Sequence, residues 1–230
     1  MNHFLVFQHT YNGVQVALFD DQQLVQITTE NKKQASKNIV ALADEMLRVN
    51  NVSFRDLSFI AANQGPGPFT TLRVIIATVN GLAFATQKSL IGVDGLDALL
   101  SEYRNESYPI TVALLNAYGG DVYFGVEILR NTKREKGYQH IASLLSHLNS
   151  SFPTQTIRFI GQAVSMHTQL IDQTFGDRAF IPAPLPEHCS TKQVGKMALH
   201  SWTKQEGLTN QLLPLYLKSM TIKKQAPTNF

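Results

Sequence analysis

Two amide side chains stand where buried strands run into hairpins. Gln8 precedes the turn Tyr-Asn-Gly at 11–13, and Asn116 precedes the turn Tyr-Gly-Gly at 118–120. A carboxylate at such a strand end could serve as a general base or bind the metal of a nucleotide, whereas an amide supplies neither a base nor an anionic ligand. These two positions therefore argue against a kinase or ATPase that works on its own.

The other residues that could carry chemistry form no catalytic or metal-binding pattern. The sequence has no HExxH, HxxxH or GxSxG motif. Its single cysteine, Cys189, follows His188 directly, so the two side chains point in different directions and indicate no dyad. The histidines are His3, His9, His140, His147, His167, His188 and His200. We interpret them as scattered surface or core residues.

The stretch 63–73, Asn-Gln-Gly-Pro-Gly-Pro-Phe-Thr-Thr-Leu-Arg, predicts a tight turn between a strand and a helix. Glycine permits positive φ, and proline suits the first helical turn. The turn lacks the lysine and the spacing of a phosphate loop. Its amides still precede a helix N-terminus, so weak anion binding stays open.

The helix expected over 69–87 is apolar nearly all round, which is typical of a helix buried on more than one side. Ala77, Gly81 and Ala85 form a stripe of small residues four apart. Two interpretations remain. The helix is either a central core helix, or it has one face on its own sheet and another on a partner helix that approaches closely over the stripe.

The elements that position these residues form two similar halves. The first half reads β-β-β-α-β-α-β-α, and a strand and glycine hairpin start the pattern again near Pro109. We expect an N-terminal lobe over 1–108, a C-terminal lobe over 109–218 and a flexible tail over 219–230. The strands are expected at 3–7, 14–19, 24–27, 58–62, 90–93, 111–115, 122–129 and 157–160, with an edge segment at 214–218. The helices are expected at 36–50, 69–87, 96–103, 140–148, 164–175 and 191–204, and a loop at 131–137.

Bulk composition is that of an ordinary globular protein of 230 residues. One cysteine excludes an intramolecular disulfide framework. The net charge is +3. Residues 1–108 contribute −2 (8 Lys/Arg, 10 Asp/Glu), and residues 109–230 contribute +5 (12 Lys/Arg, 7 Asp/Glu). This mild asymmetry permits weak contact with an anion such as RNA. We find no signal peptide pattern and no long uncharged apolar run, so a cytoplasmic location without a membrane is expected.

Five segments resemble the TsaB (YeaZ) family in the same order along the chain. GPGPFTTLR (65–73), VNGLAFA (79–85) and LIGVDGLDAL (90–99) are similar to the family's GPGSFTGxR, QGLA and GVSxLxAL patterns. NAYGGDVY (116–123) is similar to DARxGEVY, and PLYLK (214–218) to a closing PxYLR. The resemblance spans nearly the whole chain, and its first block is fairly specific.

The resemblance implies a fold and a role. The fold is the α/β two-lobe actin-like ATPase/sugar-kinase (ASKHA) fold with duplicated β-β-β-α-β-α lobes. The role is that of a non-catalytic scaffold for TsaD, the paralogue that transfers threonylcarbamoyl to the adenosine next to the tRNA anticodon, forming t6A. TsaE joins as an ATPase, and tRNA contact is indirect. No cofactor of its own is implied, while nucleotide at the partner interface and a homodimer in isolation stay open.

Carried over position by position, the resemblance implies a partner interface on the helices of the first lobe. The interface residues are Val40, Leu47, Thr70, Arg73, Val74, Ala77, Gly81 and Ala85, and Arg73 is expected to form ion pairs there. The helix start is set by Gly65, Pro66, Gly67 and Phe69. No catalytic or metal-binding residue is implied.

The chain departs from the family pattern in ways that bear on nucleotide contact. Gln8-His9-Thr10 stands where Asp-Thr-Ser is usual, and Asn-Ala-Tyr at 116–118 stands where Asp-Ala-Arg is usual. Pro68 and Thr71 replace a serine and a glycine. The helices are unaffected, which indicates a divergent member. The alternatives are a nucleotide-dependent kinase or ATPase of the same fold and a metallopeptidase, which would need bound zinc.

Overall fold

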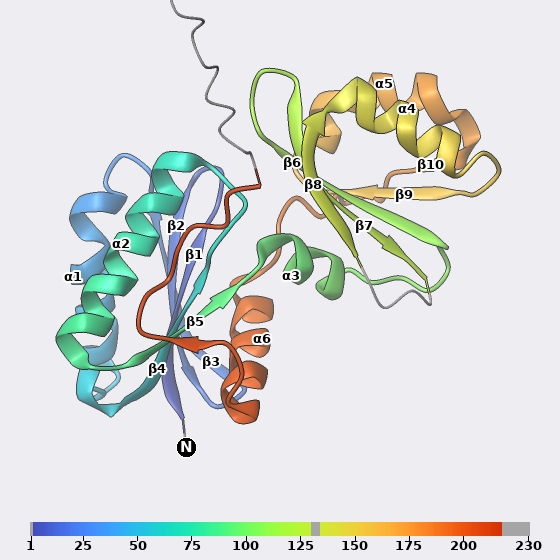
Figure 1. Ribbon diagram of the computed structural model, residues 1–230. Coiled ribbons are helices and arrows are strands. Elements are labelled where there is room, and N and C mark those ends of the chain that lie inside the picture. The colour runs from blue at the N-terminus through green and yellow to red at the C-terminus, as the bar shows by residue number, and fades with distance from the viewer. Residues whose placement is uncertain (1, 130–133, 218–230) are drawn as a thin grey trace, which may run out of the picture.

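The computed structural model describes residues 2–129 and 134–217. Within these ranges the chain forms two lobes, each built on one mixed sheet (Figure 1). The tail expected over 219–230 and residues 131–133 of the loop expected at 131–137 lie outside the described residues.

The first sheet has six strands in the order β11-β5-β4-β1-β2-β3. β1, β2 and β3 form an antiparallel meander, and β4 and β5 run parallel to β1. The bounds are β1 (His3–His9), β2 (Gly13–Asp20), β3 (Gln23–Asn31), β4 (Leu57–Asn63), β5 (Ser89–Val93) and β11 (Leu208–Thr209). Neighbouring residues of a strand face opposite sides of the sheet, so Leu5 and Phe7 belong to one core and Phe4 and Val6 to another.

Helices α1 (Ala35–Val49) and α2 (Phe69–Thr86) cover the Leu5 side of this sheet (Figure 1). A short 3-10 helix, η1 (Phe54–Asp56), leads from α1 into β4. On α1 the buried residues recur at helical spacing, from Ile39 and Ala43 to Met46 and Leu47, and make one apolar face.

The second sheet has five strands in the order β10-β9-β6-β7-β8. Its strands are β6 (Ile110–Asn116), β7 (Asp121–Ile128), β8 (Glu135–His140), β9 (Ile157–Ile160) and β10 (Ala179–Phe180). Helices α4 (Ile141–Ser151) and α5 (Val164–Phe175), followed by η2 (Gly176–Arg178), pack together on one face (Figure 1).

The two sheets repeat one topology. In both, three antiparallel strands are followed by two parallel ones, giving β3-β2-β1-β4-β5 and β8-β7-β6-β9-β10. The expected duplicated two-lobe actin-like fold is therefore confirmed.

The last helix of each half packs on the sheet of the other half. α3 (Gly95–Glu102) follows β5 and contacts β6 and β7, whereas α6 (Thr191–Lys204) follows β10 and contacts β1, β4 and β5. A shared apolar core joins both sheets through these two helices. The second lobe expected over 109–218 is therefore too long at its C-terminal end, because α6 and β11 belong to the first sheet.

Two local expectations were wrong. The segment expected as the end of a loop and the start of a helix forms β8, which pairs with β7, and α4 begins only at Ile141. The expected edge segment at 214–218 forms no strand among the described residues. Its chain crosses α2 instead: Asn80 and Leu212 exchange hydrogen bonds of 3.0 and 2.8 Å, and the Leu215 amide donates to the Gln64 carbonyl at 2.7 Å.

Candidate functional site

Gln8, at the end of β1, is completely buried where the lobes meet. Its Nε2 donates a 2.9 Å hydrogen bond to the Cys189 carbonyl, and its Oε1 accepts a 2.8 Å hydrogen bond from Nδ2 of Asn63. Oδ1 of Asn63 then accepts from the Gly65 amide at 2.9 Å. The Gln8 amide thus connects β1 to β4 and to the segment before α6 by hydrogen bonds. An amide cannot act as a general base.

Asn116, the matching residue at the end of β6, also forms structural hydrogen bonds with the two hairpins. Its Oδ1 accepts a 2.8 Å hydrogen bond from the Tyr118 amide, which closes the second hairpin. Its carbonyl accepts a 2.9 Å hydrogen bond from the hydroxyl of Tyr11 in the first hairpin. Both strand-end amides therefore hold the structure together.

His9 fills the space between the first hairpin and the turn before α2. A Cβ on Gly67 would lie 2.2 Å from the His9 ring, so only glycine allows this approach. The imidazole is 6% exposed, and its Nε2 has no hydrogen-bond partner among the described residues. Burial, helped by the nearby His188, lowers the pKa of His9 to about 4. The ring is therefore neutral at pH 7.

The cavity beside His9 measures about 20 Å³ and is lined by Gln8, Tyr11, Asn63 and Cys189 among others. That volume admits about one water molecule and is far below the several hundred Å³ of a typical small-molecule site. Burial raises the pKa of the Cys189 thiol to about 12, so it remains protonated. In the described residues, no group of three or more His, Cys, Asp or Glu side chains could hold a metal ion.

The turn before α2 is held by the segments next to it. The Gly95 amide at the start of α3 donates to the Gly65 carbonyl at 2.8 Å, and Gly65 takes a φ of 106°. α2 starts at Phe69, whose half-exposed ring stacks on Tyr216 at 5.7 Å between centroids. The Arg73 guanidinium lies 5.1 Å from the Phe69 ring centroid in a cation–π contact. The turn thus fixes both the direction of α2 and an aromatic cluster at its start.

α2 has one buried and one uncovered face. Leu72, Ile75, Ile76, Val79 and Ala83 pack on the sheet. On the opposite side, Arg73, Ala77, Gly81, Phe84 and Ala85 are exposed, and a Cβ on Gly81 would meet nothing within 4 Å.

The length and composition of α2 are those of a membrane span, with a mean hydropathy of 1.4, but buried core helices share these properties. Only 33% of its residues are buried in the chain. One face of this apolar helix is therefore left uncovered by its own chain.

The structure places most of the expected interface residues on this uncovered surface. Thr70, Arg73, Ala77, Gly81 and Ala85 are exposed on α2, where Val74 is half-buried, and Val40 is 47% exposed on α1.

Leu47 is an exception, because it is 1% exposed and faces the sheet together with Ala43 and Met46. Arg73 faces Phe69 and has no ion-pair partner in the part of the chain that the structure describes.

Two apolar residues of this surface escaped the sequence analysis. Phe84 on α2 is 82% exposed and Val49 at the end of α1 is 60% exposed. Phe84 lies seven residues after Ala77 and three after Gly81, which places all three on one side of the helix. That spacing was the available signal.

The fold and the strand-end amides define a two-lobe protein of the actin-like class without an acid at either strand end. Comparison with known proteins specifies it further. The profile of the family described as "TsaD: tRNA N6-adenosine threonylcarbamoyltransferase" matches residues 24–214. The chain belongs to this family, among the TsaB (YeaZ) proteins of tRNA threonylcarbamoyladenosine biosynthesis.

Curated relatives and solved structures agree with this assignment to the TsaB (YeaZ) proteins. The chain is 23% identical to TsaB of Bacillus subtilis over 205 residues, covering 87% of each chain. It is 26% identical to TsaB of Buchnera aphidicola from Schizaphis graminum over 117 residues, 50% of this chain and 55% of that relative, and so spans about half of it. YeaZ from Pseudomonas aeruginosa has the same fold, with a TM-score of 0.72 and 22% identity over 94% of this chain and 100% of that one.

Proposed function

We propose that this chain is a non-catalytic scaffold subunit that binds the catalytic paralogue TsaD through α1 and α2, in the complex that forms t6A next to the tRNA anticodon. The observation that carries the proposal is the exposed apolar face of α2. It is apolar enough to span a membrane, yet only 33% of its residues are buried by its own chain. Such a helix needs a second apolar surface.

The small side chains of α2 suit a helix as that surface. Ala77, Gly81 and Ala85 are exposed and four residues apart, and nothing in the chain fills the space above Gly81. Helix axes pack 8–10 Å apart depending on the side chains between them, and small residues favour the close end of this range. Phe84 and Val40, both exposed, would add apolar contact at the sides.

TsaD is the partner that this geometry favours. A paralogue of the same fold would present its own pair of helices on the matching sheet face, so the two pairs would meet as four helices. TsaE and a nucleotide at the interface would join this complex, which would reside in the cytoplasm. A homodimer over the same face is the expected state without TsaD.

A catalytic role of its own is not supported by the strand ends. The amides of Gln8 and Asn116 are committed to structural hydrogen bonds, and the cavity beside them measures about 20 Å³. Neither a kinase nor an ATPase reaction finds a base, an anionic metal ligand or room for a nucleotide there. No described cluster favours the metallopeptidase alternative.

The test is co-expression of the chain with TsaD of its own organism, followed by affinity purification and size-exclusion chromatography. Wild type should co-purify with TsaD, and Gly81→Leu should lower the yield of the complex by more than tenfold without lowering the thermal unfolding temperature. The leucine has space because nothing lies within 4 Å of the Gly81 Cβ position. Gln169→Leu, on the exposed side of α5, is the matched control and should retain the complex.

Two outcomes would contradict the proposal. A Gly81→Leu variant that still binds TsaD would show that α2 is not the contact, and one that unfolds would show that its outer face is part of the core. Arg73→Ala provides a second check, because loss of the guanidinium above Phe69 should weaken TsaD binding. The homodimer is followed by light scattering without TsaD, and Gly81→Leu should convert it to a monomer.

A further inference from the structure

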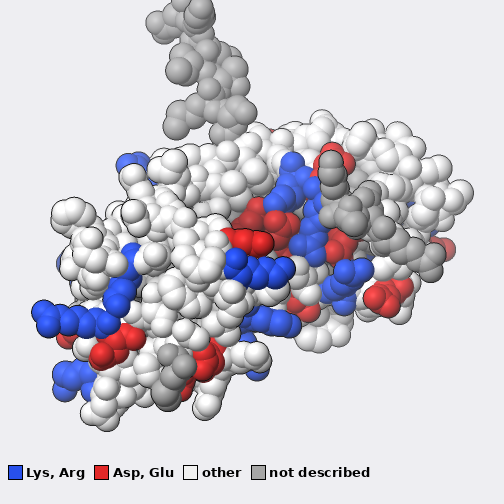
Figure 2. Space-filling view, turned by 60° about the horizontal axis from the view of Figure 1, so that its bottom comes forward, with Lys and Arg blue, Asp and Glu red and all other residues white. Residues whose placement is uncertain are grey.

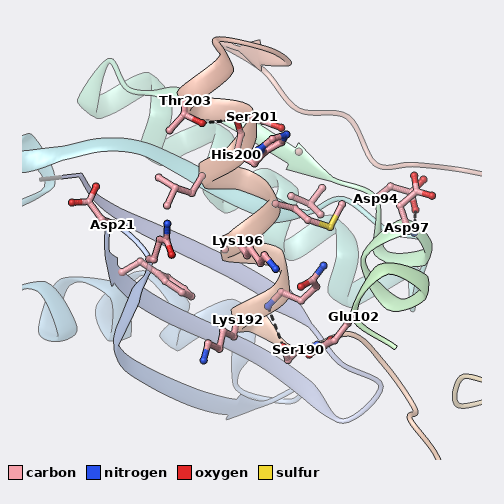
Figure 3. A pocket seen from close by; sticks show the side chains of 18 residues that line it. Asp21, Asp94, Asp97, Glu102, Ser190, Lys192, Lys196, His200, Ser201 and Thr203 are labelled. Atoms are coloured by element: carbon pink, nitrogen blue, oxygen red, sulfur yellow. Dashed lines mark hydrogen bonds between the residues drawn. The ribbon is translucent and has the colours of Figure 1, made fainter. Parts of the chain in front are cut away.

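A broad trough of about 810 Å³ lies on the side of the first sheet opposite α1 and α2. α6 forms its floor, the β2–β3 turn with Asp21 forms one wall, and the start of α3 with Asp94 and Asp97 forms the other. Figure 2 shows basic side chains crossing this side of the molecule, with acidic ones beside them. In the close view, Lys192, Lys196 and His200 follow one another along α6 (Figure 3).

The lysines on the floor have no partner inside the described chain. Lys192, Lys196 and His200 are exposed and spaced four residues apart, and Lys204 ends the same helix. Within the described ranges, neither Lys192 nor Lys196 has an ion-pair or side-chain hydrogen-bond partner. Their charges are therefore available to a ligand.

The acids on the walls, by contrast, are engaged inside the chain. Nζ of Lys136 contacts both Asp94 and Asp97 at 2.6 Å, and Arg134 also reaches Asp97. Glu102 accepts hydrogen bonds from the amide and hydroxyl of Ser190 at 2.6 and 2.5 Å. Asp21 accepts hydrogen bonds from Asn2. Lys136 and Arg134 thus offset the charges of Asp94 and Asp97, whereas Glu102 and Asp21 are bonded by neutral donors and keep their charge at the edges of the floor. Within the described residues, Lys192 and Lys196 are left without an acidic partner on the floor itself.

We propose that this row on α6, Lys192, Lys196 and His200, binds the phosphodiester backbone of RNA. Residues four apart on a helix are about 6 Å apart along its axis. Lysines at that spacing, followed by the imidazole of His200 as a hydrogen-bonding group, can follow a chain that carries one negative charge per nucleotide. The row has no aromatic side chain on which a base could stack, so the contact would position RNA without reading its sequence.

The RNA partner is favoured over an acidic protein because the chain belongs to a family of tRNA modification. The location supports it as well. α6 packs on the Phe4 side of the sheet and α1 and α2 on the Leu5 side, so the row stays open when a partner covers α2. This direct contact goes beyond the scaffold role and does not depend on TsaD binding at α2.

The test measures binding of a fluorescein-labelled tRNA transcript to the complex of this chain with TsaD, over a range of salt concentrations. The double variant Lys192→Gln/Lys196→Gln should bind more weakly and should lower the slope of log affinity against log salt by about 2, one for each phosphate contact. Lys192→Arg/Lys196→Arg keeps the charge and should retain the wild-type slope. Lys32→Gln/Lys33→Gln removes the same charge from an exposed turn before α1 and should also retain it.

The outcomes separate this proposal from the scaffold role. An unchanged affinity and slope for the α6 double glutamine variant would overturn the RNA contact, as would an equal loss in the Lys32/Lys33 variant. The α6 double glutamine variant could instead lose TsaD while its own tRNA affinity keeps the wild-type dependence on salt. That result would show that the trough contacts protein, and it would overturn the proposal too. If wild type forms no complex with TsaD, the same three variants measured as the isolated chain decide the RNA contact while the scaffold role fails.

Discussion

The hydroxyl of Tyr11 donates a 2.9 Å hydrogen bond to the main-chain carbonyl of Asn116, and this bond joins the hairpin of the first lobe to the strand end of the second. Burial raises the pKa of the Tyr11 phenol well above its usual value, so the donor proton is kept through the alkaline range. The two residues occupy neighbouring places in the two copies of the repeat. This bond thus fastens the two lobes to each other at their hairpins.

Tyr11→Phe should therefore destabilise the protein by about 1–2 kcal/mol, because a largely buried carbonyl loses its donor. Urea unfolding measures this change, and hydrogen exchange of the β6 amides should rise if the lobes separate. Tyr118→Phe is the matched control: Tyr118 holds the equivalent place in the second hairpin, is 59% exposed, and should change stability by less than about 0.5 kcal/mol. Equal effects of the two variants would show that the bond contributes nothing.

His9 should make the protein sensitive to acid. Burial lowers its folded-state pKa from 6.5 to about 4, so the unfolded chain takes up a proton first as the pH falls. Its contribution to stability is therefore complete above about pH 6.5 and is lost between there and pH 4, by about 3 kcal/mol at most. His9→Gln should remove this part of the pH dependence in chemical unfolding measured from pH 7 to pH 4. Parallel losses in wild type and variant would contradict the prediction.

Lys136 should stabilise the contact between the lobes, since it lies on β8, whereas Asp94 caps the N-terminus of α3 and Asp97 lies in its first turn. Burial alone would lower the pKa of Lys136, but hydrogen bonds to the two carboxylates outweigh it and raise the pKa. The stabilisation is therefore present below pH 10.5 and is lost as the pH rises through the raised pKa. Lys136→Met should cost about 1–2 kcal/mol at pH 7 and less at high salt.

The measurement is urea unfolding at neutral and alkaline pH. The gap between wild type and Lys136→Met should narrow above pH 10.5, and a gap independent of pH and salt would indicate lost packing alone. Lys88→Met is a control, because Lys88 is bound to the Arg55 carbonyl and lies away from the second lobe.

Two glycines should respond to alanine in opposite directions. At Gly67 the new Cβ would lie 2.2 Å from the His9 ring, so Gly67→Ala should destabilise by about 1–3 kcal/mol. At Gly81 the Cβ would meet nothing within 4 Å, and a helix interior favours alanine, so Gly81→Ala should stabilise by about 0.5–1 kcal/mol. Thermal unfolding of both variants checks the pair, and a shift of the same sign in both would refute the assigned environments.

The sequence predicts the local parts of this fold well. The helix at 69–87 and the repeated hairpins are encoded by nearby residues, and the structure has α2 at Phe69–Thr86 and the same strand order in both lobes. β8 was missed because Glu-Lys-Gly-Tyr-Gln-His is polar and the strand is at most half-buried at the sheet edge, so it has little apolar alternation. The packing of α6 on the first sheet was missed because it depends on contacts more than 100 residues apart along the chain.

The candidate surface was predicted in part for similar reasons. Ala77, Gly81 and Ala85 are recognisable because small residues four apart lie on one side of a helix and allow another helix to approach closely. The exposure of Phe84 could not be predicted, because the pattern of a helix that is apolar all round does not show which side is buried. The burial of Leu47 could have been predicted, since Ile39, Ala43 and Leu47 are four residues apart on the apolar face of α1, and all three are buried. The pairing of Gln8 with Cys189 could not be predicted, because 181 residues separate them.

The exchange of α3 and α6 has a consequence for how the chain is made. The side of the first sheet that carries Phe4 and Phe59 is covered by α6, which starts at Thr191, whereas β5 ends at Val93. At roughly 5–20 residues per second, a ribosome needs about 5–20 s to add the intervening residues. During that time this apolar side of the nascent sheet has no cover of its own. The half of the protein that is translated first is therefore completed only after α6 has been synthesised.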